Sequence, residues 1–426
     1  MTSNRVWPMA HPIQRLILAA VVLAVVLIQA PASSQSPAPA VDIPVLAYYY
    51  IWFTPDSWDR AKTDLPLLGP YASDDPATMR QHVQWAKTIG IDGFLVSWKH
   101  TEPLSHRLAQ LVEIAAEEDF KLSIIYESLD FWRHPLPVDR IEQDFAYFSE
   151  TYGSNPVFDM FGNPVVMWSG TWQFDRTEIA RVTEPHRDRL QILASEKQPE
   201  HYTRVADLFD GNSYYWSSVN PATFPDYSGK LQRMRDAVDE YGGLWIAPAA
   251  PGFDAQHLGG DREVPRHDGA TLETELATAL ESAPDAIGLI SWNEFSENSH
   301  IEPSCEYGDD YLAITARLLG GSQVSVDHTC DEVALATAEA GAVVASPIAG
   351  TATNQPSPGV GAALDWDSST PGGTVDRGAR LGILLLIGSL FGLMAISIVQ
   401  IARRAIRLEG SGQEPPDSNS FGRAGG

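Results

Sequence analysis

The sequence has little positive charge for its size. It contains 29 lysine and arginine residues against 55 aspartate and glutamate residues, which gives a formal net charge of −26. Because such a surface repels phosphate backbones, we expect no nucleic-acid partner. Hydrophobic residues make up 44% of the chain and aromatic residues 10%, so disorder throughout is excluded and a sizeable core is expected.

Cysteine is almost absent. The two cysteines are Cys305 and Cys330, and no closely spaced histidines accompany them, so the sequence carries no zinc pattern and we expect no metal. In a secreted protein these two cysteines would form one disulfide. Two free, buried thiols are the alternative.

Three sequence motifs are also missing. The chain has no G-x-G-x-x-G fingerprint, no P-loop and no G-x-S-x-G elbow. Their absence argues against nucleotide chemistry and against a serine hydrolase, and we expect no cofactor.

The N-terminal segment has the features of a secretion signal. Arg5 and Arg15 precede the apolar residues 16–28, and the small residues of "APA" follow. This pattern predicts a signal peptide over residues 1–32, with an uncleaved N-terminal anchor as the alternative. A short linker rich in serine and proline is expected over residues 33–43.

A second membrane signal lies near the C-terminus. Residues 380–402 are almost wholly apolar and match the roughly 20 residues that a helix needs to cross a bilayer. Residues 332–379 are rich in Ala, Gly, Ser, Thr and Pro, which predicts a flexible stalk. The tail, residues 403–426, opens with three arginines, so we expect it to be cytoplasmic. The lipid bilayer is thus a predicted partner: a single-pass protein of the cell membrane with its body outside.

The body, residues 44–331, alternates apolar runs with amphipathic stretches. Eight runs are typical of short buried strands: "IPVLAYYY", "DGFLVSW", "KLSIIYE", "PVVMWSG", "LQILASE", "LFDGNSYYW", "GLWIAPA" and "AIGLISWNE". Asp75 and Pro76 begin a helix between two of them, as N-cap and first helical residue. The alternation predicts a (β/α)₈ TIM barrel. An open doubly wound sheet is the alternative, although a glycine-rich loop would be expected after its first strand.

The active face of such a barrel lies at the C-terminal ends of its strands. Aromatic and polar residues end most of the eight runs, which predicts a mouth suited to neutral sugars. The candidate substrate-binding residues are Tyr49, Tyr50, Trp52, Trp98, Glu127, Trp168, Tyr214, Trp216, Trp292 and Asn293.

Glu294 and Glu297 follow the eighth run, in "SWNEFSENSHIEP". Glycoside cleavage needs two carboxyl groups, and aromatic walls keep one of them protonated near neutrality by desolvation. The alternative is that these glutamates are the acidic first turn of a helix, which the helix dipole favours without any catalysis. Glu196, beside Lys197 in "SEKQ", is interpreted as a surface residue.

Several stretches together resemble glycoside hydrolase family 99, the endo-α-mannosidases and endomannanases. They are "YYYIWF", "GPYASDDPATMRQHVQWAKTIGIDGFLVSW", "IIYE", "GNPVVMW" and "SWNEFSENSHIEPS". The resemblance implies a (β/α)₈ barrel that cleaves α-mannosides inside a chain with retention. It assigns Glu294 as the base and Glu297 as the general acid/base, Glu127 as a substrate ligand, and Tyr49 and Trp98 as aromatic subsite residues.

The motif departs from the family's N-E-W-H-E-G at three positions: Phe295, Ser296 and Asn298. Both glutamates are kept, but the sugar and linkage stay open. Three functions follow: a hydrolase of mannan-like chains, a barrel that binds polysaccharide without cutting it, and a transglycosidase or α-glucanase using the same carboxylates.

Overall fold

The computed structural model describes residues 41–130, 132–326 and 330. The predicted signal peptide, stalk, membrane helix and cytoplasmic tail lie outside these residues. Within the described part of the chain, none of the helices is both long enough and apolar enough to cross a bilayer.

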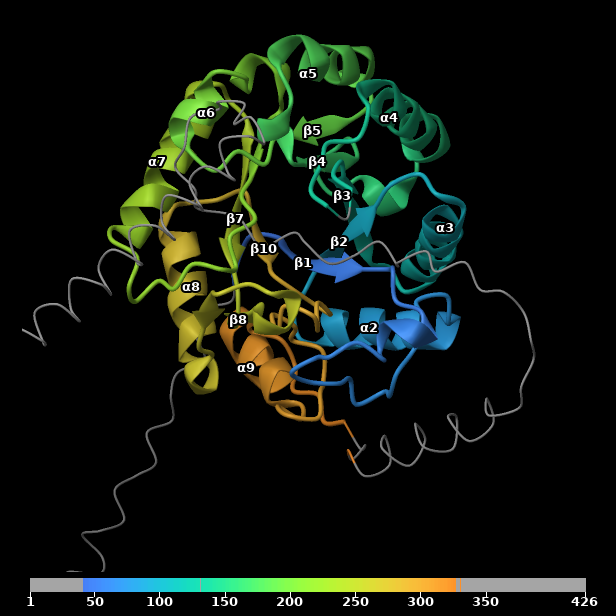
Figure 1. Cartoon of the computed structure of the whole chain (residues 1–426), viewed down its shortest axis with the longest axis vertical. Helices are drawn as coiled ribbons and strands as arrows, with labels where there is room; N and C mark the ends of the chain where they lie inside the picture. Colours follow the sequence, from blue (N-terminus) through green and yellow to red (C-terminus); the bar gives the residue numbers. More distant parts are fainter. Residues whose placement is uncertain (1–40, 131, 327–329, 331–426) are drawn as a thin grey trace, which may run out of the picture. The chain divides into compact units, whose positions relative to one another are not determined.

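Eight parallel strands form the centre of the body (Figure 1). Their order is β5-β4-β3-β2-β1-β10-β7-β6, and a parallel bridge between Ala194 and Asn212 joins the two ends of this sheet. The strands are β1 (Val45–Tyr50), β2 (Gly93–Trp98), β3 (Lys121–Glu127), β4 (Val165–Ser169), β5 (Gln191–Leu193), β6 (Gly211–Ser213), β7 (Leu244–Ala249) and β10 (Ala286–Leu289). The predicted barrel is therefore confirmed for the described residues, and the open doubly wound sheet is excluded.

Helices surround the strands in Figure 1. They are α2 (Pro76–Thr88), α3 (Glu102–Glu117), α4 (Val138–Tyr152), α5 (Arg176–Thr183), α6 (Pro199–Thr203), α7 (Tyr227–Glu240), α8 (Ala270–Glu281) and α9 (Asp310–Leu319). The start of α2 follows the sequence signal, because the Asp75 carboxylate accepts the N–H of Ala77 at 3.0 Å and Pro76 is the first helical residue.

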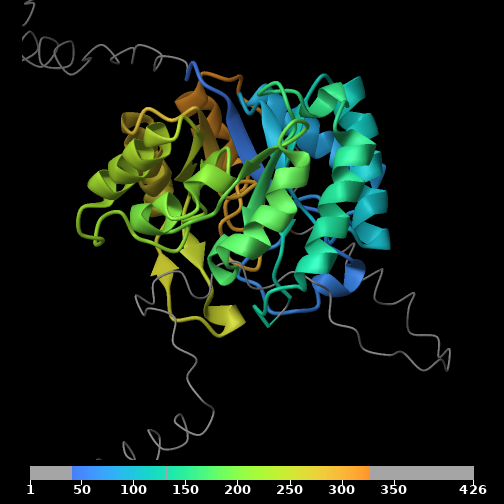
Figure 2. The same ribbon diagram turned by 90° about the horizontal axis from the view of Figure 1, so that it is seen from above.

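Two features of the fold differ from the simple repeat. Strands β5 and β6 have only three residues each, shorter than the apolar runs that predicted them. The segment after β7 forms an extra hairpin of β8 (Phe253–Asp254) and β9 (Glu263–Val264), which projects from one end of the barrel (Figure 2).

Side chains of β1 alternate between the barrel interior and the helix layer, as the pleat of a strand requires. The hydroxyl of Tyr48 lies 3.2 Å from Sδ of Met167 on β4 and 3.0 Å from Oγ of Ser213 on β6, so Tyr48 points inward. The hydroxyl of Tyr49 lies 3.0 Å from Nδ1 of His82 on α2, so Tyr49 points outward. This alternation determines which residues reach the mouth.

Candidate active site

Glu294 and Glu297 lie in the loop of residues 291–302, which follows β10. Their side chains are 3% and 2% exposed. The loop consists of turns and bends, and the next helix, α9, begins only at Asp310. The two glutamates are therefore not the first turn of a helix, and the helix-cap interpretation of this acidic pair is wrong.

A pair of tyrosines lies beside the two carboxylates. Tyr50 from β1 and Tyr215, just after β6, are hydrogen-bonded through their hydroxyls at 2.6 Å. Burial raises the pKa of both phenols well above its usual value, and the negative charges of Glu297 and Glu294 raise it further. Both hydroxyls therefore remain protonated, and because one donates to the other, the pair has one further O–H to donate beside the carboxylates.

Glu294 titrates near neutrality. Burial raises the pKa of its carboxyl group to about 7, although the Ser296 N–H, which donates to Oε1 at 2.9 Å, and the positive charge of Lys62 both act to lower it. A carboxyl group with a pKa near the working pH can exchange protons in either direction, which suits general acid–base chemistry.

Glu127, at the end of β3, lies on the same side of the barrel as Glu294 and Glu297. Its negative charge contributes to the raised pKa of Glu294. Its Oε1 accepts a hydrogen bond from the Ser97 hydroxyl at 2.9 Å, and its side chain is partly exposed. Burial raises the pKa of Glu127, while Ser97 and the charges of Lys99 and Arg133 oppose that rise. Three carboxyl groups thus gather at one end of the barrel.

Trp52 is the sixth residue of this group. It is half-buried, and its ring centroid lies 4.3 Å from that of Tyr50. The structure thus brings together Tyr50, Trp52, Glu127, Glu294 and Glu297 of the predicted site, and adds Tyr215. The predicted set left Tyr215 out, although it is two residues beyond the inward-facing Ser213 and therefore shares its face of the strand.

Six other predicted substrate-binding residues lie elsewhere. Each is buried in the layer between the strands and the helices, on the outward face of its strand or just beyond it: Tyr49, Trp98, Trp168, Tyr214, Trp216 and Trp292. Trp98 packs on Tyr147 and Phe148 of α4, and Trp216 stacks on Tyr227 of α7. These residues lie at or near the ends of their strands, as predicted, but their side chains point away from the mouth, as the pleat requires for those on the strands. We correct the predicted set by removing them.

Asn293 has a structural role that also differs from substrate binding. Its side-chain oxygen accepts the N–H of Tyr50 at 2.8 Å, and its side-chain nitrogen donates to the carbonyl of Tyr50 at 2.9 Å. The same nitrogen lies 3.2 Å from the hydroxyl of Tyr71, which donates to Oε2 of Glu302 at 2.9 Å. Asn293 therefore fixes the 291–302 loop to the end of β1, next to the inward-facing Tyr50.

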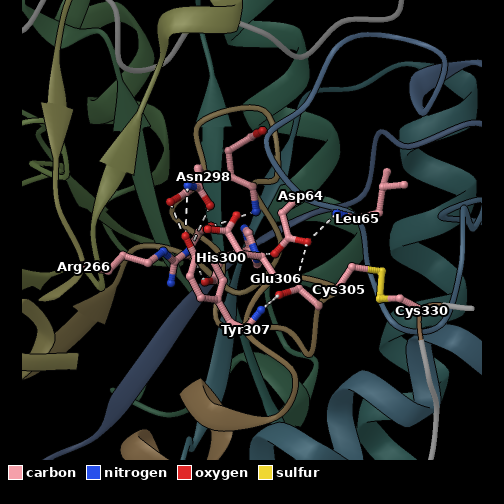
Figure 3. Close-up of polar contacts among 12 residues, drawn as sticks. Asp64, Leu65, Arg266, Asn298, His300, Cys305, Glu306, Tyr307 and Cys330 are labelled. Atoms are coloured by element: carbon pink, nitrogen blue, oxygen red, sulfur yellow. Dashed lines mark hydrogen bonds and ion pairs between the residues drawn. A yellow bond between two sulfur atoms is a disulfide. The ribbon is translucent and has the colours of Figure 1, made fainter. Parts of the chain in front are cut away.

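A buried arginine holds the other side of the 291–302 loop (Figure 3). Nη2 of Arg266 donates to the carbonyls of Asn298 at 3.0 Å and His300 at 2.8 Å. The guanidinium carbon lies 4.3 Å from the ring centroid of Tyr307 and 4.4 Å from that of Tyr311. Aromatic faces on the guanidinium stabilise its charge in this buried position. Arg266 thereby keeps the carbonyl of Asn298, the residue after Glu297, in place.

Asp64 and His300 form a second contact to this loop, also drawn in Figure 3. Nε2 of His300 lies 3.1 Å from Oδ2 of Asp64, and burial lowers the pKa of His300 to about 4. The contact is therefore a hydrogen bond of neutral histidine at neutral pH rather than an ion pair. The His300 ring stacks on Phe295 with centroids 4.0 Å apart, which packs the residue next to Glu294.

Cys305 and Cys330 form a disulfide, the first of the two alternatives for these residues. Their Cα atoms are 5.4 Å apart, within the usual range for such a bond. The Cys305 N–H donates to the carbonyl of Leu65 at 2.8 Å, so the disulfide is anchored beside the Asp64 contact (Figure 3).

Glu196, after β5, is buried and not a surface residue. It is 3% exposed, and Asn212 bonds both its backbone N–H, at 2.8 Å, and its carbonyl, at 3.2 Å. Burial raises its pKa, with the Thr171 hydroxyl acting in the opposite direction. The polar neighbours in "SEKQ" misled the prediction, because the end of a barrel strand is enclosed by the adjoining loops.

No group of three or more His, Cys, Asp or Glu side chains placed to hold a metal ion occurs within residues 41–130, 132–326 and 330.

The sequence of this chain also matches a known protein family. The model of glycosyl hydrolase family 99 matches residues 53–312, more than half of the chain. The chain belongs to glycosyl hydrolase family 99. The match includes both glutamates of the 291–302 loop, Glu127 and the Tyr215 position, and ends inside α9.

Named relatives of this family 99 chain are distant. It is 21% identical over 271 residues to a glycoprotein endo-alpha-1,2-mannosidase-like protein of Danio rerio, with 57% of this chain and 60% of that protein covered. It is 20% identical over 271 residues to the glycoprotein endo-alpha-1,2-mannosidase of Mus musculus, with 57% of each chain covered. The chain thus spans about 60% of the length of these curated relatives.

A solved structure supports the fold. The GH99 endo-alpha-mannosidase from Bacteroides thetaiotaomicron superposes with a TM-score of 0.58 at 19% sequence identity, covering 66% of this chain and 97% of that one. At this identity the likeness speaks for the barrel alone.

Proposed function

We propose that the protein is a retaining glycoside hydrolase that cleaves α-linked, mannan-like chains. The observation that carries the proposal is the buried pair of Glu294 and Glu297 beside protonated tyrosines, with the pKa of Glu294 at about 7. Glycosidic cleavage uses two such groups, one to protonate the leaving oxygen and one as a base or nucleophile. Membership of family 99 supports the α-mannoside, because one of the relatives is the glycoprotein endo-alpha-1,2-mannosidase of Mus musculus and another is an endo-alpha-1,2-mannosidase-like protein.

In the first step, Glu297 donates its proton to the glycosidic oxygen as the bond from that oxygen to the anomeric carbon breaks. Glu294, as carboxylate, takes the proton of the sugar 2-hydroxyl, and the resulting oxygen attacks the anomeric carbon to give a 1,2-anhydro sugar. In the second step, water attacks that carbon and gives its proton to Glu297, while Glu294 returns its proton to the 2-oxygen. Two inversions at the anomeric carbon give net retention.

The surroundings of Glu294 fit this role. A base that must take a proton from a weakly acidic hydroxyl gains driving force from a raised pKa, provided that it is still ionised at the working pH. Burial raises the pKa of Glu294, while the Ser296 N–H and the charge of Lys62 limit that rise, so that the ionised form is still populated near neutral pH. The hydrogen-bonded Tyr50 and Tyr215 place a hydroxyl donor beside the two carboxylates, where charge changes during both steps.

The test uses the full chain and a panel of α-mannan and α-glucan oligosaccharides, with release of new reducing ends as the readout. Glu294→Gln and Glu297→Gln should each lower kcat by about 10²–10⁴, the usual contribution of acid–base groups. Glu306→Gln is the matched control, because Glu306 is exposed and lies a few residues beyond the same loop. Unchanged kcat in either active-site variant would refute the assignment.

The same panel separates the other functions. Retention of glycans by the unmodified chain without any cleavage would identify a binding barrel. Longer products built from the substrate would identify a transglycosidase, and cleavage confined to α-glucans would replace the mannan-like substrate.

We also propose that the body faces the outside of the cell on a single C-terminal membrane helix. The support is the apolar run at residues 380–402, followed by arginines, together with the secretion signal at residues 1–32. Deleting residues 381–407 should move the protein from the membrane fraction to the soluble fraction. A membrane-bound deletion variant would contradict this part of the proposal.

A further inference from the structure

An exposed tryptophan lies on the face of the barrel that carries the carboxylates. Trp132, in the loop between β3 and α4, is 71% exposed. Among large hydrophobic side chains in the described part of the chain, only Tyr241, at 46%, is comparably exposed. Tyr241 lies between α7 and β7, and such loops are at the opposite end of a (β/α)₈ barrel from the active face.

The loop that carries Trp132 is held in a defined turn. Oδ1 of Asp130 accepts the backbone N–H groups of Trp132 and His134, both at 2.8 Å, and the Asp130 N–H donates to the carbonyl of His134 at 2.8 Å. A β-bridge between Leu129 and Pro135 closes the base of the loop. The indole is therefore presented by a preorganised backbone, which lowers the entropy lost on binding.

The loop also lies close to the carboxylates. It starts directly after Glu127, and Nζ of Lys99, at the end of β2, donates to the carbonyl of Leu129 at 3.3 Å. The charge of Arg133, the residue after Trp132, acts on the carboxyl group of Glu127. The tip of the loop is thus adjacent to the mouth of the barrel.

At 71% exposure, the indole of Trp132 presents a large apolar ring surface to water, which is suited to the C–H face of a sugar ring. Its neighbours Asp130 and His134 contact each other, with Nδ1 of His134 3.3 Å from Oδ2 of Asp130, and this contact further fixes the turn that carries the indole. We propose that Trp132 is a stacking platform for a pyranose ring of the substrate chain, outside the sugars on which Glu294 and Glu297 act. The ligand class is a neutral oligosaccharide long enough to reach from the carboxylates to the loop tip. This inference rests on the proposed function.

The test compares kcat/KM of the full chain for α-mannan oligosaccharides of increasing length. Trp132→Ala should leave kcat/KM for the shortest cleaved oligosaccharide unchanged. It should lower kcat/KM about tenfold for oligosaccharides long enough to reach the loop, which is the size expected for loss of one aromatic contact. Trp132→Phe should restore most of the loss. Tyr241→Ala is the control and should change nothing at any length. Equal kcat/KM for Trp132→Ala and wild type at all lengths, or an equal fall at all lengths, would overturn the proposal.

Retardation of the protein in gels containing soluble α-mannan separates this inference from the proposed function. If the wild type cleaves no substrate, the proposed hydrolase function is wrong. Weaker retardation of Trp132→Ala than of Tyr241→Ala would still support Trp132 as a stacking platform. A wild type that is neither active nor retarded overturns both. If Trp132→Ala changes the sedimentation coefficient and not the retardation, the indole is a protein contact and the platform is wrong.

Discussion

Replacing Arg266 by methionine tests whether the 291–302 loop depends on this buried cation. The substitution keeps a long apolar stem but removes the donors to the carbonyls of Asn298 and His300. It also removes the charge between the rings of Tyr307 and Tyr311. Two carbonyls are then left without these bonds in a buried loop that carries Glu294 and Glu297.

The magnitude follows from these contacts. A hydrogen bond from a charged donor contributes about 1.5–3 kcal/mol, so two contribute roughly 3–6 kcal/mol. Burial of the guanidinium opposes this, as its lowered pKa indicates, and relief of that penalty returns a few kcal/mol. We expect Arg266→Met to lower the free energy of unfolding by about 2–4 kcal/mol. A displacement of the glutamates by about 1 Å would lower kcat about 10²-fold.

The assays are urea unfolding and the pH profile of kcat and KM on an α-mannan oligosaccharide. Arg262→Met, in the same segment after β7, is the control and should change neither the free energy of unfolding nor the pH profile of kcat and KM. Arg266→Lys keeps the charge but not the forked donors, so it should lie between wild type and Arg266→Met. The reasoning is refuted if Arg266→Met is destabilised as expected and yet keeps the wild-type kcat and pH profile.

Three further predictions concern charge and covalent links. We expect kcat/KM of the wild type to rise with pH near 7 as Glu294 ionises, and Lys62→Met should move this rise to higher pH because the charge of Lys62 lowers the pKa of Glu294; a midpoint that stays or falls contradicts this role. His300 is buried with its pKa lowered from 6.5 to about 4, so its contribution to stability is complete above pH 6.5 and is lost as the pH falls through 4; His300→Gln should flatten this acid limb in urea unfolding curves. Cys305→Ser should cost about 3.5 kcal/mol, from the chain entropy of a loop spanning 25 residues, and an unfolding midpoint equal to that of the oxidised wild type would contradict this.

The barrel could be predicted from the sequence because most of its buried strands lie in apolar runs and some of its helices begin with local signals. Asp75 and Pro76 are an example, since their cap acts within one turn and needs no tertiary contact. The place of Glu294 and Glu297 could be predicted for a related reason: they come a few residues after the last strand, β10, and the end of a barrel strand is at the active face.

The direction of each side chain was harder to predict. Tyr49 and Tyr50 are neighbours in a uniformly apolar run, and only the pleat decides that one packs on His82 and the other meets Tyr215. Strands buried on both faces give no alternating pattern from which to read this register. The inward Ser213 fixes it for β6, but that contact is made across the barrel and is not visible in the sequence.

The contacts that hold the 291–302 loop could not be predicted from the sequence either. Arg266, Asp64 and Asn298 are far apart or unremarkable in sequence, and they meet because the loops after β1, β7 and β10 converge at one end of the barrel. Convergence of loops depends on their lengths and paths, which no local propensity specifies.

The anomeric configuration of the first product tests the central claim most directly. Proton NMR is recorded from the first seconds after the wild-type chain is mixed with an α-mannan oligosaccharide, before mutarotation. Cleavage by Glu294 and Glu297 through two successive inversions predicts a new α-anomeric reducing end. A β-anomer as the first product, or no new reducing end from any mannan in the panel, would contradict the account.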